Sequence, residues 1–252
     1  MRFNIPALPP IQLNTIIQIF LTLAASLFTL RVGAGLFAWR AANNLEKPNY
    51  TVIKRLPISP PSRRGNIEVR KYDSYLIAET TVDESSMRKA GSKGFGKCAG
   101  YIFGKNEART KSSESASEKM AMTAPVRSVG DAGEKMAMTA PVRGVGNTKG
   151  KTKISFVIGS KYDLQSAPKP IDKDVKVKKI NEHYLAATSF SGPPPNDEKI
   201  SKERDLILQT LEREGIRVKD KEVLVYGYHD PIITPNILRK NEVAVMVDGS
   251  SV

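Results

Sequence analysis

Cysteine and histidine are scarce in this chain of 252 residues, which has one cysteine, Cys98, and two histidines, His183 and His229. A single cysteine excludes an intrachain disulfide, and such a chain is more easily accommodated in a reducing compartment. The two histidines are 46 residues apart, without the spacing of a metal-binding motif. The sequence therefore indicates neither a disulfide scaffold nor a zinc module.

Recognisable catalytic arrangements are also lacking. Gly91 to Cys98, GSKGFGKC, falls one residue short of a phosphate-binding loop, because Cys98 replaces the hydroxyl that would bind magnesium. His229 is the better placed histidine, since it ends an expected strand beside an acid, but no nucleophile accompanies it. No acid, base and nucleophile converge in the sequence, so we expect a protein that is not an enzyme.

Acidic residues are absent from residues 1–44, which carry three arginines. Ile11 to Leu30 is an uncharged run of 20 residues, about the length that spans a bilayer as a helix. A membrane-spanning anchor, a cleaved signal or organelle-targeting segment and a buried helix all fit this run. Basic residues are commoner after the run than before it. The positive-inside rule therefore places the following domain in the cytosol, or in the stroma or matrix of an organelle such as the chloroplast.

The chain is basic, with 39 lysines and arginines against 26 acidic residues and a net charge of +13. Such a surplus suggests an anionic partner: a membrane surface, a carboxylate ligand or a nucleic acid. The basic residues are scattered without an aromatic–basic motif, so we expect no nucleic-acid partner. Residues 45–65 read as a basic linker with one strand at Tyr50–Ile53. This linker either is simply solvated or lies against anionic lipid headgroups.

The chain contains one repeated string, EKMAMTAPVR, at Glu118–Arg127 and again at Glu134–Arg143, 16 residues later. Each copy precedes a small-residue segment, Gly144-Val145-Gly146 in the second case, which predicts a turn. Period two places both methionines of a copy on one strand face, so the repeat predicts a two-stranded ribbon. Methionine suits an irregular core or a permissive apolar ligand surface. The methionines concerned are Met120, Met122, Met136 and Met138.

The rest of the chain alternates strands and helices. Expected strands are the pair within Asn66–Val82, then Lys153–Ile158, Val175–Ile180, Tyr184–Phe190, Val223–Tyr228 and Val243–Val247. Helices are expected near residues 85–103, capped by Asp83 or Ser85, and at Glu198–Glu214, stopped by Gly215. Two strands, a helix and more strands thus occur twice. This order predicts an α+β domain at residues 66–249, a mixed sheet or barrel with both helices outside.

Several of these strings together resemble the SOUL heme-binding family. The resemblance runs from about Tyr50 to Val247 and includes IEVRKYDSYLIAET at Ile67–Thr80 and LRKNEV at Leu238–Val243. EKMAMTAPV is its most recognisable string, and tandem copies are similar to those of plant and algal members. The resemblance implies a distorted antiparallel or mixed β-barrel of two βα repeats with two outer helices, here following an N-terminal hydrophobic helix.

The resemblance also implies a function, non-enzymatic binding or transport of heme or a related tetrapyrrole, non-covalently and without a firm axial ligand. With the apolar run, this would take place at a membrane surface, with lipid as a second partner. The alternative is a membrane-associated scaffolding module with a vestigial pocket. A porphyrin needs apolar contacts and basic residues for its carboxylates. We expect Met87, Arg88 and Phe95 on the first helix to form one wall, and the four repeat methionines another.

Overall fold

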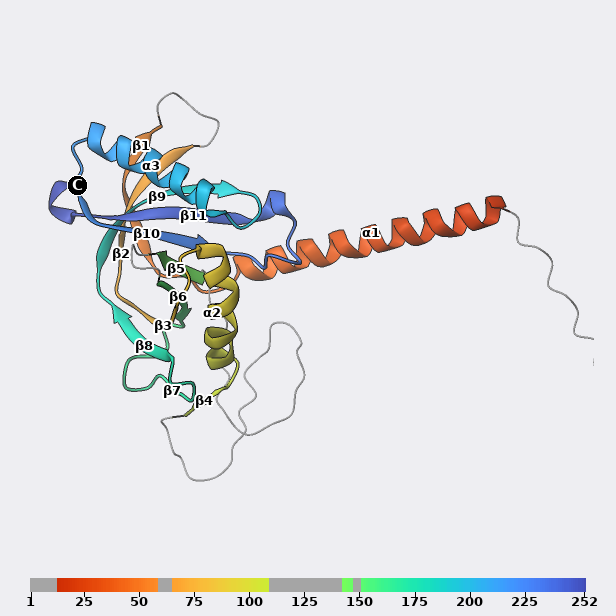
Figure 1. Cartoon of the computed structure of the whole chain (residues 1–252), viewed down its shortest axis with the longest axis horizontal. Coiled ribbons are helices and arrows are strands. Elements are labelled where there is room, and N and C mark those ends of the chain that lie inside the picture. The colour runs from red at the N-terminus through yellow and green to blue at the C-terminus, as the bar shows by residue number, and fades with distance from the viewer. Residues whose placement is uncertain (1–12, 59–64, 109–141, 147–150) are drawn as a thin grey trace, which may run out of the picture.

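The computed structural model describes residues 13–58, 65–108, 142–146 and 151–252. A long helix, α1 (Leu13–Asn43), leads into a curled sheet with two helices on its outer face, α2 (Met87–Ile102) and α3 (Asp197–Arg213) (Figure 1). The first repeat copy and all but the last two residues of the second lie outside the described residues. The expected ribbon and its four methionines therefore stay predictions.

The main sheet has nine strands in the order β1-β2-β9-β11-β10-β5-β6-β3-β8, and all of its pairings are antiparallel. Its edge strands β1 and β8 do not pair with each other in the described chain, so the sheet is an open half-barrel rather than a closed barrel. A two-stranded sheet of β4 and β7 lies beside it. The strands are β1 (Tyr50–Pro57), β2 (Asn66–Tyr72), β3 (Tyr75–Val82), β4 (Asn106–Glu107), β5 (Val142–Gly146), β6 (Thr152–Ile158), β7 (Lys169–Pro170), β8 (Val175–Ile180), β9 (His183–Ser191), β10 (Val218–Gly227) and β11 (Lys240–Val247).

The turn expected at Gly144-Val145-Gly146 is wrong. Gly144-Val145-Gly146 is the end of strand β5, which pairs with β10 on one side and with β6 on the other. Small residues suggest a turn from local propensity alone, but two flanking strands provide hydrogen bonds that extend the backbone here. The strand expected within residues 45–65 is present as β1, which pairs with β2 along its length.

Helix α3 is specified by local sequence at both ends. The Asn196 side chain accepts a hydrogen bond from the Lys199 amide (2.9 Å), which satisfies one of the free donors at the helix start. Gly215 follows the helix with φ = +68°, a backbone conformation that favours glycine. The helix buries Ile207 and Leu211 against the sheet, where strand β11 contributes Val243 and other valines to the same core.

Helix α2 forms despite three glycines in its first ten residues, because packing outweighs propensity. Gly94 lies so close to strand β6 that an added Cβ would stand 2.8 Å from the Ile154 side chain. Glycine therefore lets the helix approach the sheet, and Cys98 and Ile102 fill the core beneath it. The N-cap is Ser86 rather than the expected Asp83 or Ser85, since the Ser86 side chain accepts from the Lys89 amide.

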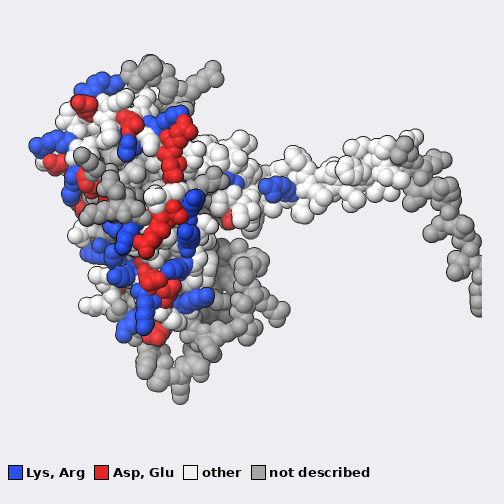
Figure 2. Space-filling model, in the orientation of Figure 1, with Lys and Arg blue, Asp and Glu red and all other residues white. Residues whose placement is uncertain are grey.

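Helix α1 projects away from the domain (Figure 1), and its projecting surface is almost free of charge (Figure 2). It is long and apolar enough to cross a membrane, and the apolar window is not buried in the domain. The buried-helix hypothesis is therefore wrong. Among the described residues, the helix contacts the domain near its end, where Gly35 is buried and Ala38, Trp39, Ala41 and Ala42 are half-buried. Gly35, Ala38, Trp39 and Ala42 share one helix face at spacings of three, four and seven.

Candidate functional site

The residues predicted on α2 lie in two different settings. Met87 is half-buried at the start of the helix, where its amide donates to Asp197 Oδ1 of α3 (3.1 Å) and its side chain packs on the α3 core. Phe95 is two turns further along and 44% exposed, with its ring edge-on to Phe156 of β6 (5.2 Å between centroids). Arg88 belongs to the same helix, but its side chain is not among those the structure describes. Met120, Met122, Met136 and Met138 lie outside the described residues.

Glycines flank Phe95 along α2 and place no side chain beside its ring. A Cβ added at Gly91 or Gly96 would meet nothing within 4 Å among the described residues. The helix also carries Arg88, Lys89, Lys93 and Lys97 and no acidic residue. An exposed aromatic ring on a flat, basic helix suits a planar ligand that carries carboxylates.

A second candidate site lies on the inner face of the half-barrel, and sequence reasoning missed it. A pocket of about 160 Å³ opens between the sheet and the end of α1 with the segment that follows it. Asn43 at the end of α1 and Lys47 and Pro48 of the following segment form one side of the pocket. Its other walls are largely aromatic, and they consist of Tyr50, Tyr72, Tyr75, Val157, Tyr226, Tyr228, His229 and Lys240.

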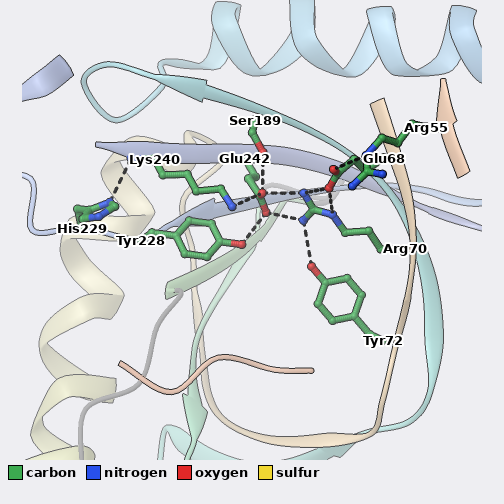
Figure 3. Close-up of polar contacts among 9 residues, drawn as sticks. All are labelled: Arg55, Glu68, Arg70, Tyr72, Ser189, Tyr228, His229, Lys240 and Glu242. Carbon is green, nitrogen blue, oxygen red and sulfur yellow. Dashed lines mark hydrogen bonds and ion pairs between the residues drawn. The ribbon is translucent and has the colours of Figure 1, made fainter. Parts of the chain in front are cut away.

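Beside this pocket lies a buried ion pair between Arg70 of β2 and Glu242 of β11 (Figure 3). The guanidinium donates Nη1 to Oε2 (3.0 Å) and Nη2 to Oε1 (2.9 Å), a two-bond geometry that only arginine provides. Both side chains are almost fully buried, at 2% and 0% exposure. Arg70 Nε also donates to Glu68 Oε2 (2.9 Å), so the arginine faces two carboxylates.

Three further side chains contact Glu242: one from β9, one from the residue after β10 and one from its own strand β11. Ser189 Oγ donates to Oε1 (2.7 Å), Tyr228 Oη donates to Oε2 (2.6 Å), and Lys240 Nζ lies 3.0 Å from Oε1. Burial alone would raise the pKa of Glu242. The hydrogen bonds and charge of Arg70, with help from Lys240 and Tyr228, instead lower that pKa to about 2. The carboxylate is thus ionised and fully engaged within the protein.

His229 follows strand β10 and lines the pocket. Its Nδ1 accepts the backbone N–H of Lys240 (3.1 Å), so the neutral ring carries its proton on Nε2. Nε2 is buried without a hydrogen-bond partner among the described residues. Burial, followed by the charges of Lys47, Lys240 and Arg239, lowers the pKa of His229, which keeps the ring neutral at pH 7.

The other metal-binding side chains are occupied within the core. His183 is stacked on Tyr72 (5.3 Å between centroids) and its Nδ1 lies 2.8 Å from the Asn181 carbonyl. Cys98 is fully buried, its thiol lies 3.5 Å from the Ile154 carbonyl oxygen, and burial raises its pKa to about 12. Within the described chain, no three His, Cys, Asp or Glu residues gather into a possible metal site.

A weak sequence signal for the inner network exists. Glu68, Arg70 and Tyr72 alternate with the apolar Ile67 and Val69, so period two predicts a polar strand face. Such a face is normally assigned to solvent. Only the sheet order places it against Glu242, which is 172 residues further along the chain.

Comparisons with known proteins agree on one family. The model of the family described as "SOUL heme-binding protein" matches residues 45–246. Heme-binding protein 2 of Homo sapiens is 28% identical over 204 residues, which cover 81% of this chain and 86% of the human protein. Heme-binding protein 2 of Mus musculus is 26% identical and covers 80% and 89%, respectively.

Solved structures show only a distant likeness. A hydrolase from Listeria innocua has a TM-score of 0.44 at 10% identity, covering 80% of this chain and 92% of its own. A bacterial transcription regulation protein from Staphylococcus aureus has a TM-score of 0.37 at 12% identity, covering 73% and 98%. These scores are too low to inform function. The family match covers most of the domain and agrees with the half-barrel and its two outer helices, so the chain belongs to the SOUL heme-binding protein family.

Proposed function

We propose that this protein binds heme or a related tetrapyrrole non-covalently on the outer face of α2, while α1 anchors it in a membrane. The observation that carries the proposal is Phe95, a large aromatic side chain left 44% exposed on a helix that glycines keep flat. Apolar burial against Phe95 would supply most of the affinity. Arg88 and Lys89 of α2 would meet the propionates, whereas Lys93 and Lys97 already pair with Glu84 and Asp174. The four repeat methionines are proposed as the opposite wall.

The inner pocket suits a tetrapyrrole less well. Its volume of about 160 Å³ is below the roughly 300–1,000 Å³ of ordinary ligand pockets. Its strongest charges, on Arg70 and Glu242, already neutralise each other. Ligand carboxylates would have to compete there with Glu242 for the guanidinium of Arg70.

Iron is expected to contribute little to affinity. Ligation through Nε2 of His229 would displace the proton from that nitrogen while Nδ1 still accepts the Lys240 amide, which requires an imidazolate. His183 is buried in an aromatic stack, and the thiol of Cys98 is held protonated in the core. Heme itself would supply the coloured macrocycle and two carboxylates, and this chain's residues would bind and orient it.

A visible-absorption titration of the full chain with hemin and with a metal-free porphyrin tests the proposal. The two dissociation constants should agree within about tenfold, or ~1.4 kcal/mol. Phe95→Ala and Arg88→Glu should weaken both ligands. Phe103→Ala should not, although it removes a ring at the end of α2 that is more exposed than Phe95 (53% against 44%). If hemin binds much more tightly than the metal-free porphyrin, and His229→Ala abolishes that difference, the proposed site is contradicted. Absence of binding to either ligand would favour the scaffolding alternative.

Membrane attachment has its own test. The full chain should sediment with membranes and resist carbonate extraction, because α1 is long and apolar enough to span a bilayer. Deletion of residues 1–44 should release the protein. An intact chain that retains α1 and yet stays in the supernatant would contradict the anchor.

A further inference from the structure

The loop between β10 and β11 exposes an unusual amount of apolar surface. Ile232 is 74% exposed, Ile233 46% and Ile237 81%. Clustered exposed isoleucines are uncommon on a surface that faces water, and they typically mark a site of interaction. Neither the α2 surface nor the inner pocket uses these three side chains.

This loop contacts α1 at the point where the helix leaves the domain (Figure 1). A Cβ added at Gly35 would stand 2.7 Å from Cδ of Pro235 and 3.2 Å from the carbonyl oxygen of Ile233. Only glycine lets the helix backbone touch the loop here. The loop is therefore fixed against the helix at a defined level along the helix axis.

With α1 across a membrane as proposed, that level would lie at the edge of the bilayer. The part of α1 before Gly35, residues 13–34, has a length of roughly 33 Å at 1.5 Å per residue, close to the roughly 30 Å of a hydrocarbon core. Arg31, one turn before Gly35, can extend its guanidinium to the headgroups. Arg40 and Lys47 are exposed on the domain side, where anionic headgroups would attract them.

Several polar backbone groups of the loop have hydrogen-bond partners inside the protein. Asp230 Oδ1 accepts the amides of both Ile232 and Ile233 at 2.7 Å. The Thr234 carbonyl accepts Nε of the buried Arg239 at 2.7 Å. These two amides and this carbonyl have partners within the loop, which lowers the cost of entering lipid, whereas the Thr234 hydroxyl is buried without a partner among the described residues.

We propose that this isoleucine loop, Pro231–Leu238, is a second membrane contact that inserts its isoleucine side chains into the headgroup–acyl boundary beside α1. The contact holds the domain at one orientation on the bilayer, which a single helix with a flexible exit would not do. The inference rests on the proposed anchoring by α1 and is independent of tetrapyrrole binding.

Single-tryptophan reporters in the full chain test the loop. Trp39, the only tryptophan, is replaced by phenylalanine, and tryptophan is introduced at Ile232, at Ile237, or at the control position Ile171 next to β7. Ile171 is also apolar and exposed (59%), but β7 lies away from α1 (Figure 1). Each variant is reconstituted into vesicles of phosphatidylcholine and phosphatidylserine, with brominated or ordinary acyl chains. Bromolipid quenching at positions 232 and 237 should exceed that at 171 at least threefold.

Flotation of the vesicles separates the possible failures. Protein that floats but shows equal quenching at 232, 237 and 171 overturns the loop contact and leaves the anchor intact. Protein that does not float overturns both. Shielding of positions 232 and 237 from soluble acrylamide without bromolipid quenching would assign the loop to a contact with a second copy of this chain and also overturn the proposal. Gly35→Leu, which forces the loop off the helix, should reduce quenching at 232 without reducing flotation.

Discussion

Replacing Glu242 with glutamine should lower the free energy of unfolding by about 3 kcal/mol, because it leaves the buried Arg70 guanidinium without its two-bond partner. The pKa of Glu242 implies a similar contribution to the free energy of unfolding. A fall from the ordinary 4.5 to about 2 corresponds to roughly 3 kcal/mol of stability. Because the folded pKa is the lower one, this stability is present above pH 4.5 and is lost as the pH falls from 4.5 through 2.

Urea unfolding of the full chain in detergent, followed by near-ultraviolet circular dichroism of the tyrosines, measures the effect. Glu198→Gln removes a carboxylate from the exposed Glu198–Lys202 pair and should leave the unfolding midpoint unchanged. In a double-mutant cycle with Arg70→Met, the losses should fall short of additivity by about 1–3 kcal/mol. A cost below about 1 kcal/mol for Glu242→Gln would refute the reasoning, and it would mean that Glu68 alone satisfies the arginine.

Other predictions concern α2. Gly94→Ala should destabilise the protein by about 1–3 kcal/mol, because the new methyl group would lie 2.8 Å from Ile154. Gly96→Ala faces open space on the same helix and should stabilise the protein by up to about 1 kcal/mol; thermal melts of the two variants check both signs. Cys98 should react with a thiol reagent only as fast as the protein unfolds, since its side chain is fully buried and its pKa is raised to about 12. Rapid labelling under native conditions would contradict that placement.

The regular elements were predictable because their signals are local. Period-two alternation in residues 66–82 gave strands β2 and β3, and the apolar spacing before Gly215 gave α3. Where tertiary packing decides, the expectations failed. Strand β5 draws its hydrogen bonds from two distant neighbours, and the openness of the half-barrel depends on edges that the sequence does not specify.

The candidate site was predictable only in part. Phe95 was identified from its place on the first helix, and the structure leaves its ring 44% exposed there. The inner network was missed because a charged strand face reads as solvated, whereas Arg70 meets Glu242 only after the whole sheet has formed. The isoleucine loop was missed because its meaning depends on contact with Gly35, some 200 residues earlier in the chain.

The end of α1 forms part of the inner pocket, so the proposed membrane anchor and the pocket share one junction. Asn43, the last residue of α1, and Pro48, five residues later, both line the pocket. Where α1 spans a membrane as proposed, a bilayer thinner than the helix would favour tilting of the helix. Tilting would strain the junction at Asn43, and the volume of the pocket would then depend on bilayer thickness.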